Sequence, residues 1–340
     1  MISQILAIAI HKYRLQKNIM DIKRIKTVGV IGGGTMGQGI IQNFAEAGLN
    51  VIVFDVDHGQ LDLCLKQIEA NLKLFKNNLL LKEKVPYVLS RISTALIDDL
   101  ETEIGKCDFF LESVPEKIEL KRQIFARLDI CKKDVILASN TSSLTVDAIA
   151  ANMKTPERVI GVHYFNPAHI MPLVEIHYGS KTSEGVIALT KELMLNVGKE
   201  VIIVKKALPG LIVNRIAGAM GREIESLLDK GIVTPEEIDI AARACYGFRA
   251  SVIGPIEGYD MIGLDILAAV GKSLYPTLDN SDLPPQFLYD KVQRGELGVK
   301  SGKGYYDYTG KSRARILDQQ NFKLLRQLAL YREIKEFDKN

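Results

Sequence analysis

The sequence has no excess of charge of one sign. Among its 340 residues, 44 Lys and Arg face 41 Asp and Glu, which gives a formal net charge of +3. Lys and Glu are interleaved through most segments, so the chain lacks the basic face that nucleic acids and anionic membranes require. We therefore expect no nucleic acid and no membrane among its partners.

Cysteine is scarce as well. The four thiols, Cys64, Cys107, Cys131 and Cys245, lie far apart, and no two form the Cys-x-x-Cys pair of a structural zinc or redox site. We expect them to be buried, reduced thiols of a cytoplasmic protein, with no bound metal.

Long apolar runs are missing too. The run at residues 5–10 is far shorter than the roughly 20 residues needed to cross a bilayer. Basic residues follow this run, whereas a signal peptide carries its charges before the apolar stretch. We expect residues 1–20 to be an N-terminal extension that takes no part in the fold. A leader that targets an organelle is the alternative, because no acidic residue precedes Asp21.

The rest of the composition is that of a globular protein, with 47% hydrophobic and 25% charged residues, and the length predicts two domains. Residues 21–206 alternate between short β-rich runs and helical patterns, which predicts an α/β domain with an open, mostly parallel sheet and helices on both faces. The predicted strands are 26–31, 51–54, 109–111, 135–138, 159–163, 173–176 and 201–204. A long helical excursion over 59–84 interrupts the alternation.

Residues 207–340 carry helical patterns and no further β-branched run of strand length. Helices are expected over 211–228, 234–244 and 260–273, with Thr234 as the N-cap before Pro235. The sequence therefore predicts a smaller, all-helical second domain that begins near Ala207. Its tail, 311–340, is a charged helix expected to pack on the outside or on a partner subunit.

A glycine-rich turn follows the first predicted strand. Gly32, Gly34 and Gly37 have the G-x-G-x-x-G spacing, with Thr35 and Met36 inside the turn, and a helical pattern follows. Such glycines permit a tight turn and let backbone N–H groups approach a pyrophosphate at a helix N-terminus. A purely structural turn is the alternative.

The next strand ends in Asp55, whose carboxylate is placed to accept hydrogen bonds from a ribose. A carboxylate repels the 2′-phosphate of NADP, and no Arg follows it, so we expect NAD to be the cofactor.

Small polar residues follow the strand at 135–138. The sequence SNTSSL, residues 139–144, brings hydroxyls and the amide of Asn140 to the carboxyl end of the sheet, where such folds bind ligands. Ser142 or Ser143 is expected to cap the next helix. Ser139, still at the strand end, is the better candidate for a hydrogen bond to substrate.

The segment 161–176, GVHYFNPAHIMPLVEI, holds the candidate base. His163 ends one strand, and a hairpin-like return brings Glu175 beside it, which fixes the tautomer and raises the basicity of the imidazole. The alternative is a buried histidine that is hydrogen-bonded within the core and has no catalytic role. His169 and His177 have no such arrangement, and we expect them at the surface.

Five ordered motifs resemble the L-3-hydroxyacyl-CoA dehydrogenase family, which includes the 3-hydroxybutyryl-CoA dehydrogenases. They are GGGTMGQGI, SNTSSL, GVHYFNPAHIMPLVEI, PGLIVNRI and GIVTPEEID. The resemblance covers about residues 25–308. It implies a Rossmann-like domain followed by a helical domain through which such enzymes dimerise, and a role in fatty acid metabolism.

The resemblance also implies roles for individual residues. His163 takes the proton of the 3-hydroxyl while C3 gives hydride to NAD, Glu175 orients His163, and Ser139 and Asn214 hold the substrate oxygens. In the same way Glu112 and Lys117 match positions near the nicotinamide ribose. Lysines at 66, 73 and 76 fall where the family meets the CoA phosphates, although a solvated lysine face is the commoner explanation.

One segment departs from the family pattern. Members that act on fatty acyl-CoA usually carry a stretch of small residues after the TPEEID motif, whereas this chain has CYGFRASVIGP, residues 245–255. Arg249 in this stretch is suited to bind a carboxylate. The alternative is therefore the same chemistry on a free 3-hydroxy carboxylate, as in gulonate, carnitine or pyridine-carboxylate dehydrogenases, unless Arg249 is only a surface residue. The third alternative is a protein that binds NAD and catalyses no reaction.

Overall fold

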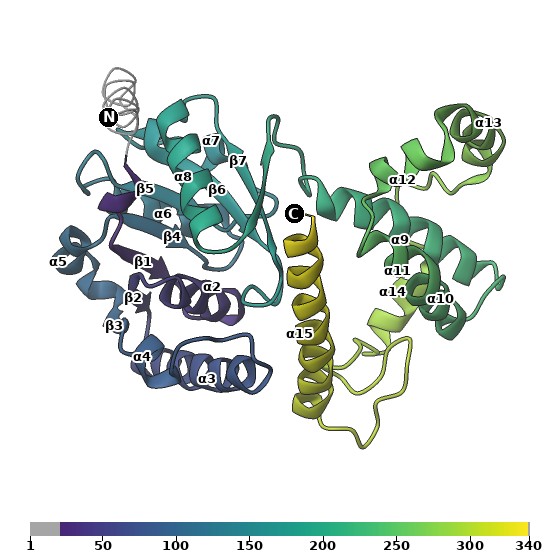
Figure 1. The fold of residues 1–340 in the computed structure, drawn as a ribbon, viewed down its shortest axis with the longest axis horizontal. Coiled ribbons are helices and arrows are strands. Elements are labelled where there is room, and N and C mark those ends of the chain that lie inside the picture. Colours follow the sequence, from purple (N-terminus) through teal and green to yellow (C-terminus); the bar gives the residue numbers. More distant parts are fainter. Residues whose placement is uncertain (1–20, 339–340) are drawn as a thin grey trace. The chain divides into compact units, whose positions relative to one another are not determined.

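The computed structural model describes residues 21–338, so the predicted extension at 1–20 lies outside the described residues. The chain divides into two compact units between Ile212 and Val213. The strands belong to the first unit and a series of helices forms the second (Figure 1).

The first unit is built on one eight-stranded sheet with the order β3-β2-β1-β4-β5-β6-β7-β8. Every neighbouring pair is parallel except β6 and β7, which are antiparallel. The strand order reverses beside β1, and ligands bind at such a reversal in doubly wound sheets. The predicted α/β, Rossmann-like doubly wound fold is confirmed. The strands are β1 (Thr27–Ile31), β2 (Asn50–Asp55), β3 (Ile92–Leu96), β4 (Phe109–Glu112), β5 (Ile136–Ser139), β6 (Val159–Tyr164), β7 (Leu173–Tyr178) and β8 (Glu200–Val204).

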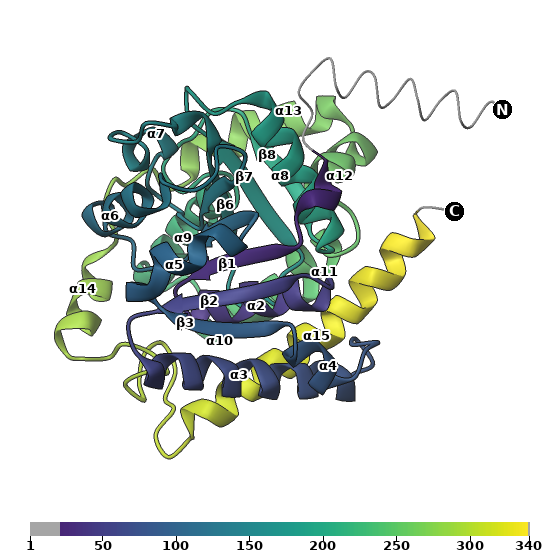
Figure 2. The same ribbon diagram turned by 90° about the vertical axis from the view of Figure 1, so that its left-hand side faces the viewer.

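Helices cover both faces of this sheet, which is why its central strands read as unbroken apolar runs. Side chains of alternate strand residues, such as Phe54, Phe110 and Leu137, pack on one face against α5, α6 and α7. On the other face α2 and α3 pack together beside β1 and β2 (Figure 2), and α8 packs on β7 and β8. These helices are α2 (Thr35–Glu46), α3 (His58–Asn77), α5 (Leu100–Glu103), α6 (Ile118–Leu128), α7 (Val146–Ile149) and α8 (Glu184–Asn196).

One strand, β3, has no counterpart among the predicted strands. The excursion predicted as helical over 59–84 is α3, which is followed by the short α4 (Val85–Leu89) and then by β3. β3 is the edge strand beside β2, and its residues are half-buried or exposed. An edge strand needs no apolar run, so its sequence, ISTAL, carries little strand signal.

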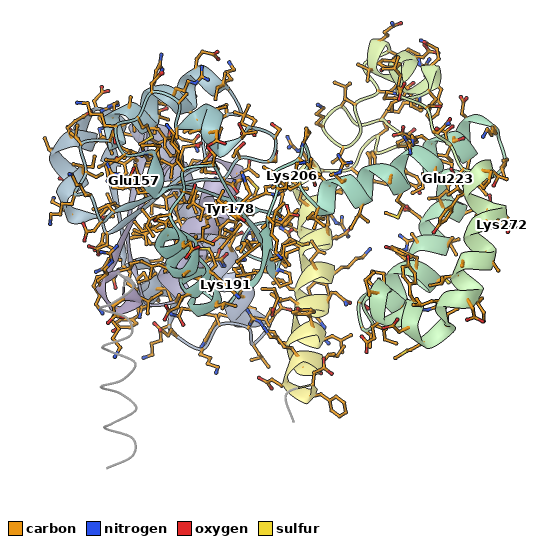
Figure 3. All side chains as sticks on the ribbon, turned by 90° about the horizontal axis from the view of Figure 1, so that it is seen from above. Glu157, Tyr178, Lys191, Lys206, Glu223 and Lys272 are labelled. Atoms are coloured by element: carbon orange, nitrogen blue, oxygen red, sulfur yellow. The ribbon has the colours of Figure 1, made fainter. Side chains whose placement is uncertain are left out.

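The second unit is helical, and Thr234 caps α10 through a capping box with Glu237, as predicted. The single helix predicted over 260–273 is instead two helices, α12 and α13, which meet at Gly263, where φ is +104°. Glu223 on α9 accepts a hydrogen bond from the Asp279 N–H (2.8 Å), and Figure 3 labels Glu223 together with Lys272 on α13. The helices are α9 (Val213–Asp229), α10 (Pro235–Ala241), α11 (Gly247–Ala250), α12 (Pro255–Ile262), α13 (Leu264–Leu274), α14 (Gln286–Gln293) and α15 (Arg313–Phe337).

The second unit buries few apolar side chains. Within residues 213–338 the buried apolar side chains are Leu325 and Leu328 alone. Many large apolar residues are exposed instead, and we call them the apolar surface of the second unit: Phe248, Val252, Ile256, Met261, Leu264 and Tyr275. Cys245 is exposed in this unit, contrary to prediction, whereas Cys64, Cys107 and Cys131 are buried, and all four thiols are free. Over residues 21–338, no helix is both long and apolar enough to cross a membrane.

Candidate active site

The glycine-rich turn follows β1 at the point where the strand order reverses. Gly32 has φ +102°, and a Cβ added there would lie 2.7 Å from the Ser113 carbonyl oxygen. A Cβ on Gly37 would lie 1.9 Å from the carbonyl oxygen of Gly32. The turn therefore requires glycine at both positions. Gly34 differs, because its added Cβ would meet no atom within 4 Å, so the space over it is open.

Backbone donors surround this open space. α2 begins at Thr35, with no acidic residue in its first turn and no side chain capping its N-terminus. Among residues 21–338 the N–H groups of Gly34, Thr35 and Met36 have no hydrogen-bond acceptor. Free N–H groups and the positive end of a helix together suit an anion, and the shape fits the pyrophosphate of a dinucleotide.

Asp55 lies at the end of β2, directly beside this turn. Its carboxylate accepts hydrogen bonds from the N–H groups of Gly33 (2.6 Å) and Val56 (2.7 Å). Each oxygen keeps a lone pair for a ribose hydroxyl. Gln60, which the sequence analysis missed, donates its side-chain amide to the Gly33 carbonyl (3.0 Å) and so holds the turn in shape.

His163 and Glu175 form a buried pair at the end of the sheet. The antiparallel pairing of β6 and β7 sets the two residues directly opposite each other. His163 Nδ1 lies 2.8 Å from Glu175 Oε2, and the other carboxylate oxygen accepts the Ile212 N–H (3.0 Å). Because a carboxylate only accepts, the proton sits on Nδ1, which leaves the Nε2 lone pair unused. The contact that the spacing predicts is present.

The two histidines predicted at the surface are not there. His177 is 1% exposed, because β7 is an inner strand covered on both faces. Its ring occupies the space over Gly161, where an added Cβ would come within 2.0 Å of Nε2. Burial lowers the pKa of His177 to about 4, and burial likewise lowers the pKa of half-buried His169 to about 4. Both rings are therefore neutral near pH 7.

Ser139 and Glu112 lie at the ends of β5 and β4, and neither side chain reaches the surface. The Ser139 hydroxyl donates to Glu112 Oε2 (2.6 Å), and both residues are 0% exposed. The contacts expected from Ser139 to substrate and from Glu112 to the nicotinamide ribose stay predictions, and in this structure the two side chains are bound to each other. Lys121 of α6, missed in the sequence, donates to both Glu112 oxygens (2.7 and 2.9 Å). In the sequence, the only indication that Lys121 is buried is its spacing of three residues from Ile124, which places both side chains on one face of α6.

The SNTSSL segment surrounds a carboxylate. Glu116 accepts hydrogen bonds from the Ser142 N–H (3.1 Å), the Ser143 N–H (3.1 Å) and the Ser143 hydroxyl (2.9 Å), and also from the hydroxyl of Thr141. Burial acts to raise the pKa of Glu116, but the hydroxyl of Thr141 and the Lys121 ammonium outweigh it and bring the pKa to about 2. The helix cap predicted at Ser142 or Ser143 is instead Thr145, which accepts the Ala148 N–H.

Asn140 and Lys117 lie beside this segment. Asn140 Oδ1 accepts the Tyr164 N–H (2.8 Å), and its amide donates to the Ser113 hydroxyl (3.3 Å). Asn140 thus joins the residue after His163 to the residue after Glu112. Lys117 precedes α6, and its side chain is exposed and available to a ligand.

The remaining predicted residues belong to the second unit. Asn214 is the second residue of α9 and is exposed. Arg249 on α11 is exposed and lines a cavity of about 180 Å³ with Tyr246, Ile253 and Tyr259. In the described part of the chain its guanidinium has no ion-pair partner.

Two of the α3 lysines already have partners. Lys73 pairs with Glu69 (2.6 Å), and Lys76 donates to the carbonyls of Leu81 and Lys82.

Comparisons with known proteins agree with this geometry. The family model "3-hydroxyacyl-CoA dehydrogenase, NAD binding domain" matches residues 27–207, and the model of the C-terminal domain matches 210–308. A 3-hydroxybutyryl-CoA dehydrogenase of Clostridioides difficile is 36% identical over 83% of this chain and 99% of its own. A 5-formyl-3-hydroxy-2-methylpyridine 4-carboxylate 5-dehydrogenase of Mesorhizobium japonicum is 31% identical over 84% of this chain and 91% of its own.

Solved structures give the same two kinds of relative. A structure of 5-formyl-3-hydroxy-2-methylpyridine 4-carboxylic acid 5-dehydrogenase, described as an NAD⁺-dependent dismutase, matches with a TM-score of 0.82 and 29% identity, covering 92% of this chain and 99% of its own. The (S)-3-hydroxybutyryl-CoA dehydrogenase of Ralstonia eutropha matches with a TM-score of 0.67 and 36% identity, covering 84% and 99%.

Proposed function

Because the chain belongs to the 3-hydroxyacyl-CoA dehydrogenase family, and is thus an NAD-dependent dehydrogenase that acts on CH–OH groups, we propose that it oxidises the L-3-hydroxyl of a short-chain 3-hydroxyacyl-CoA to the 3-ketoacyl-CoA. The observation that carries this proposal is the buried pair of His163 and Glu175, 2.8 Å apart. A neutral imidazole whose Nδ1 proton is held by a carboxylate is a general base for an alcohol.

In the proposed mechanism, the turn from Gly32 to Gly37 holds the pyrophosphate through its free N–H groups, and Asp55 accepts hydrogen bonds from a ribose. NAD bound there would supply the acceptor for the hydride that leaves C3 of the substrate. His163 Nε2 takes the hydroxyl proton, and the nearby Glu175 carboxylate stabilises the imidazolium that forms.

Asn214, two residues beyond Ile212, is assigned to a substrate oxygen. Lys117 is assigned to the cofactor. Ser139, Glu112 and Asn140 are assigned to the support of these groups, because their side chains are buried or already hydrogen-bonded within the protein.

A specific observation favours a second candidate, the same chemistry on a free hydroxy carboxylate. Arg249 lines a cavity between Tyr246 and Tyr259, where an unpaired guanidinium suits a carboxylate on a small ring or chain. Of the three α3 lysines, Lys66, Lys73 and Lys76, that the family resemblance places near the CoA phosphates, Lys73 and Lys76 already have partners. The solved pyridine-carboxylate dehydrogenase also covers more of this chain than the Ralstonia enzyme, 92% against 84%.

The test is NADH oxidation with acetoacetyl-CoA beside NAD reduction with a panel of free L-3-hydroxy acids and a hydroxymethyl pyridine carboxylate. We expect turnover of the thioester, and about a 10²- to 10⁴-fold loss of kcat in His163→Gln, the usual contribution of a general base. His58→Gln, at an exposed histidine on α3, is the matched control. Undiminished kcat in His163→Gln would contradict the mechanism.

The same panel decides the substrate. Turnover of free acids alone, with a raised KM in Arg249→Ala, would replace the CoA proposal by the carboxylate one. A KM unaltered by Arg249→Ala would leave Arg249 without a part in substrate binding.

We also propose that the protein is a homodimer formed through the second unit. The support is the apolar surface of that unit, which the described chain leaves exposed, because soluble monomers rarely expose large contiguous apolar patches.

A further inference from the structure

One ammonium group joins two carboxylates at the carboxyl end of β4, Glu112 at the strand end and Glu116 in the loop that follows it. Lys121 Nζ lies 2.7 and 2.9 Å from the two oxygens of Glu112 and 3.2 Å from Glu116 Oε2. A lysine has three N–H donors, and these three contacts use all of them. The Lys121 side chain is 1% exposed and that of Glu112 is 0% exposed, so water does not screen the pair.

Fold stability alone does not explain this cluster. Removing two charges from water is costly, and apolar side chains of similar shape often stabilise a core as well as a buried ion pair does. What an apolar replacement would lose is geometry, because each contact fixes a backbone segment. Glu112 Oε1 also accepts the Val114 N–H (2.7 Å), and Glu116 holds the N–H groups of Ser142 and Ser143.

One of these segments leads to the cofactor turn. The carbonyl of Ser113, between Glu112 and Val114, lies against Gly32, where there is no room for a Cβ. The conformation that Glu112 imposes on residues 113 and 114 therefore sets the wall of the glycine turn.

The other segment leads to the base. Glu116 fixes Thr141, Ser142 and Ser143, and the preceding Asn140 accepts the N–H of Tyr164, the residue after His163. Lys121 is thus linked on one side to the turn that receives the dinucleotide and on the other to the strand end that carries the imidazole.

We propose that Lys121 is a positioning residue of the dehydrogenase reaction: by holding Glu112 and Glu116 together it fixes the loops after β4 and β5, and so the placement of His163 relative to the cofactor turn. The part of this inference that concerns His163 rests on the proposed function. The part that concerns the cofactor turn does not.

The chain offers a matched control for a buried cation. Arg158 is 2% exposed and pairs with Asp129 (3.4 Å), but it directly precedes β6 and so lies at the amino-terminal end of that strand, whereas His163 lies near its carboxyl end. Lys121→Met and Arg158→Met each remove a buried positive charge, and the two differ in whether that charge faces the site.

The experiment measures the NADH Kd by fluorescence titration, kcat, and the melting temperature of the full-length enzyme. We expect Lys121→Met to weaken NADH binding and to lower kcat, each by tenfold or more. We expect Arg158→Met to lower the melting temperature while its folded fraction keeps both parameters within twofold of wild type. If Lys121→Met lowered the melting temperature as much as Arg158→Met does but left the NADH Kd and kcat unaltered, the proposal would be overturned.

A second variant keeps the proposal testable if Lys121→Met does not fold. Glu116→Gln leaves the pair of Glu112 and Lys121 intact and loosens only the loop after β5, so it is expected to lower kcat severalfold with an unaltered NADH Kd. A lowered NADH affinity with normal kcat in Glu116→Gln would contradict the assignment of the Glu116 contacts to the placement of His163 and of the Glu112 contacts to the cofactor turn. NADH binding does not require a base. The Kd measurements therefore still test the role of Lys121 at the cofactor turn, even if His163→Gln keeps its activity.

Discussion

At the scale of single residues, burial acts differently on two histidines of neighbouring strands. His163 has a carboxylate partner, since its Nδ1 lies 2.8 Å from Glu175 Oε2, whereas His177 fills the space over Gly161 and its pKa falls to about 4 because burial disfavours the charged ring. In the unfolded chain His177 titrates near 6.5. Below that pH, His177 binds a proton in the unfolded state but not in the folded state. Proton binding therefore favours unfolding, and this group lowers the stability of the protein as the pH falls from 6.5 towards 4.

We therefore expect the free energy of unfolding of the wild type to fall by about 2 to 3 kcal/mol more than that of His177→Phe between pH 7 and pH 4.5. The substitution keeps a flat ring over Gly161 and removes the titration. Urea unfolding at the two pH values measures the difference. Parallel losses in both proteins would show that His177 is not held neutral.

At the scale of elements, the glycine turn depends on two glycines for different reasons. Gly32 has a positive φ, whereas at Gly37 a Cβ would lie 1.9 Å from the Gly32 carbonyl oxygen. Widening the turn would displace the N–H groups of Thr35 and Met36.

Gly37→Ala is accordingly expected to raise the NADH Kd at least tenfold. Gly105→Ala is the control, because Gly105 is exposed and no atom lies within 4 Å of its added Cβ. The NADH titration gives the affinity and a thermal melt shows whether the fold survives. An NADH Kd that Gly37→Ala leaves unaltered would argue against binding at this turn.

Elements with a local signature were predictable from the sequence. The glycine turn, the helix cap at Thr234 and the return that pairs His163 with Glu175 all follow from spacing along a short segment. Lys121 and the hydroxyls of SNTSSL were not predictable in the same way, because their partners come from another element. β3 was missed because its sequence, ISTAL, on an exposed edge strand has no apolar run, and His177 because its burial depends on neighbours on both sides of the sheet.

At the scale of the whole molecule, the two units differ in how they bury apolar residues. The first unit has a contiguous core around Phe54, Phe110 and Phe125, whereas in residues 213–338 the only buried apolar side chains are Leu325 and Leu328. A helical unit of this kind requires another surface to cover it.

We expect light scattering after size exclusion to give twice the 37.8 kDa of one chain. Ile256→Glu, on α12, is expected to shift the protein to the monomer, because it places a charge in the proposed interface. Ile130→Glu, at an equally exposed site in the first unit, is the control and should leave the mass unaltered. A wild-type mass of 37.8 kDa would refute the dimer.

The scarcity of buried apolar side chains in the second unit also bears on how the protein responds to dilution. The first unit carries its own core, whereas the helices of the second unit would gain further burial only in the proposed dimer. In that dimer, mass action would enter their folding equilibrium, and the unfolding midpoint of the second unit would rise with protein concentration while that of the first would not. Inside a cell, the abundance of this enzyme would itself set how much of it is intact.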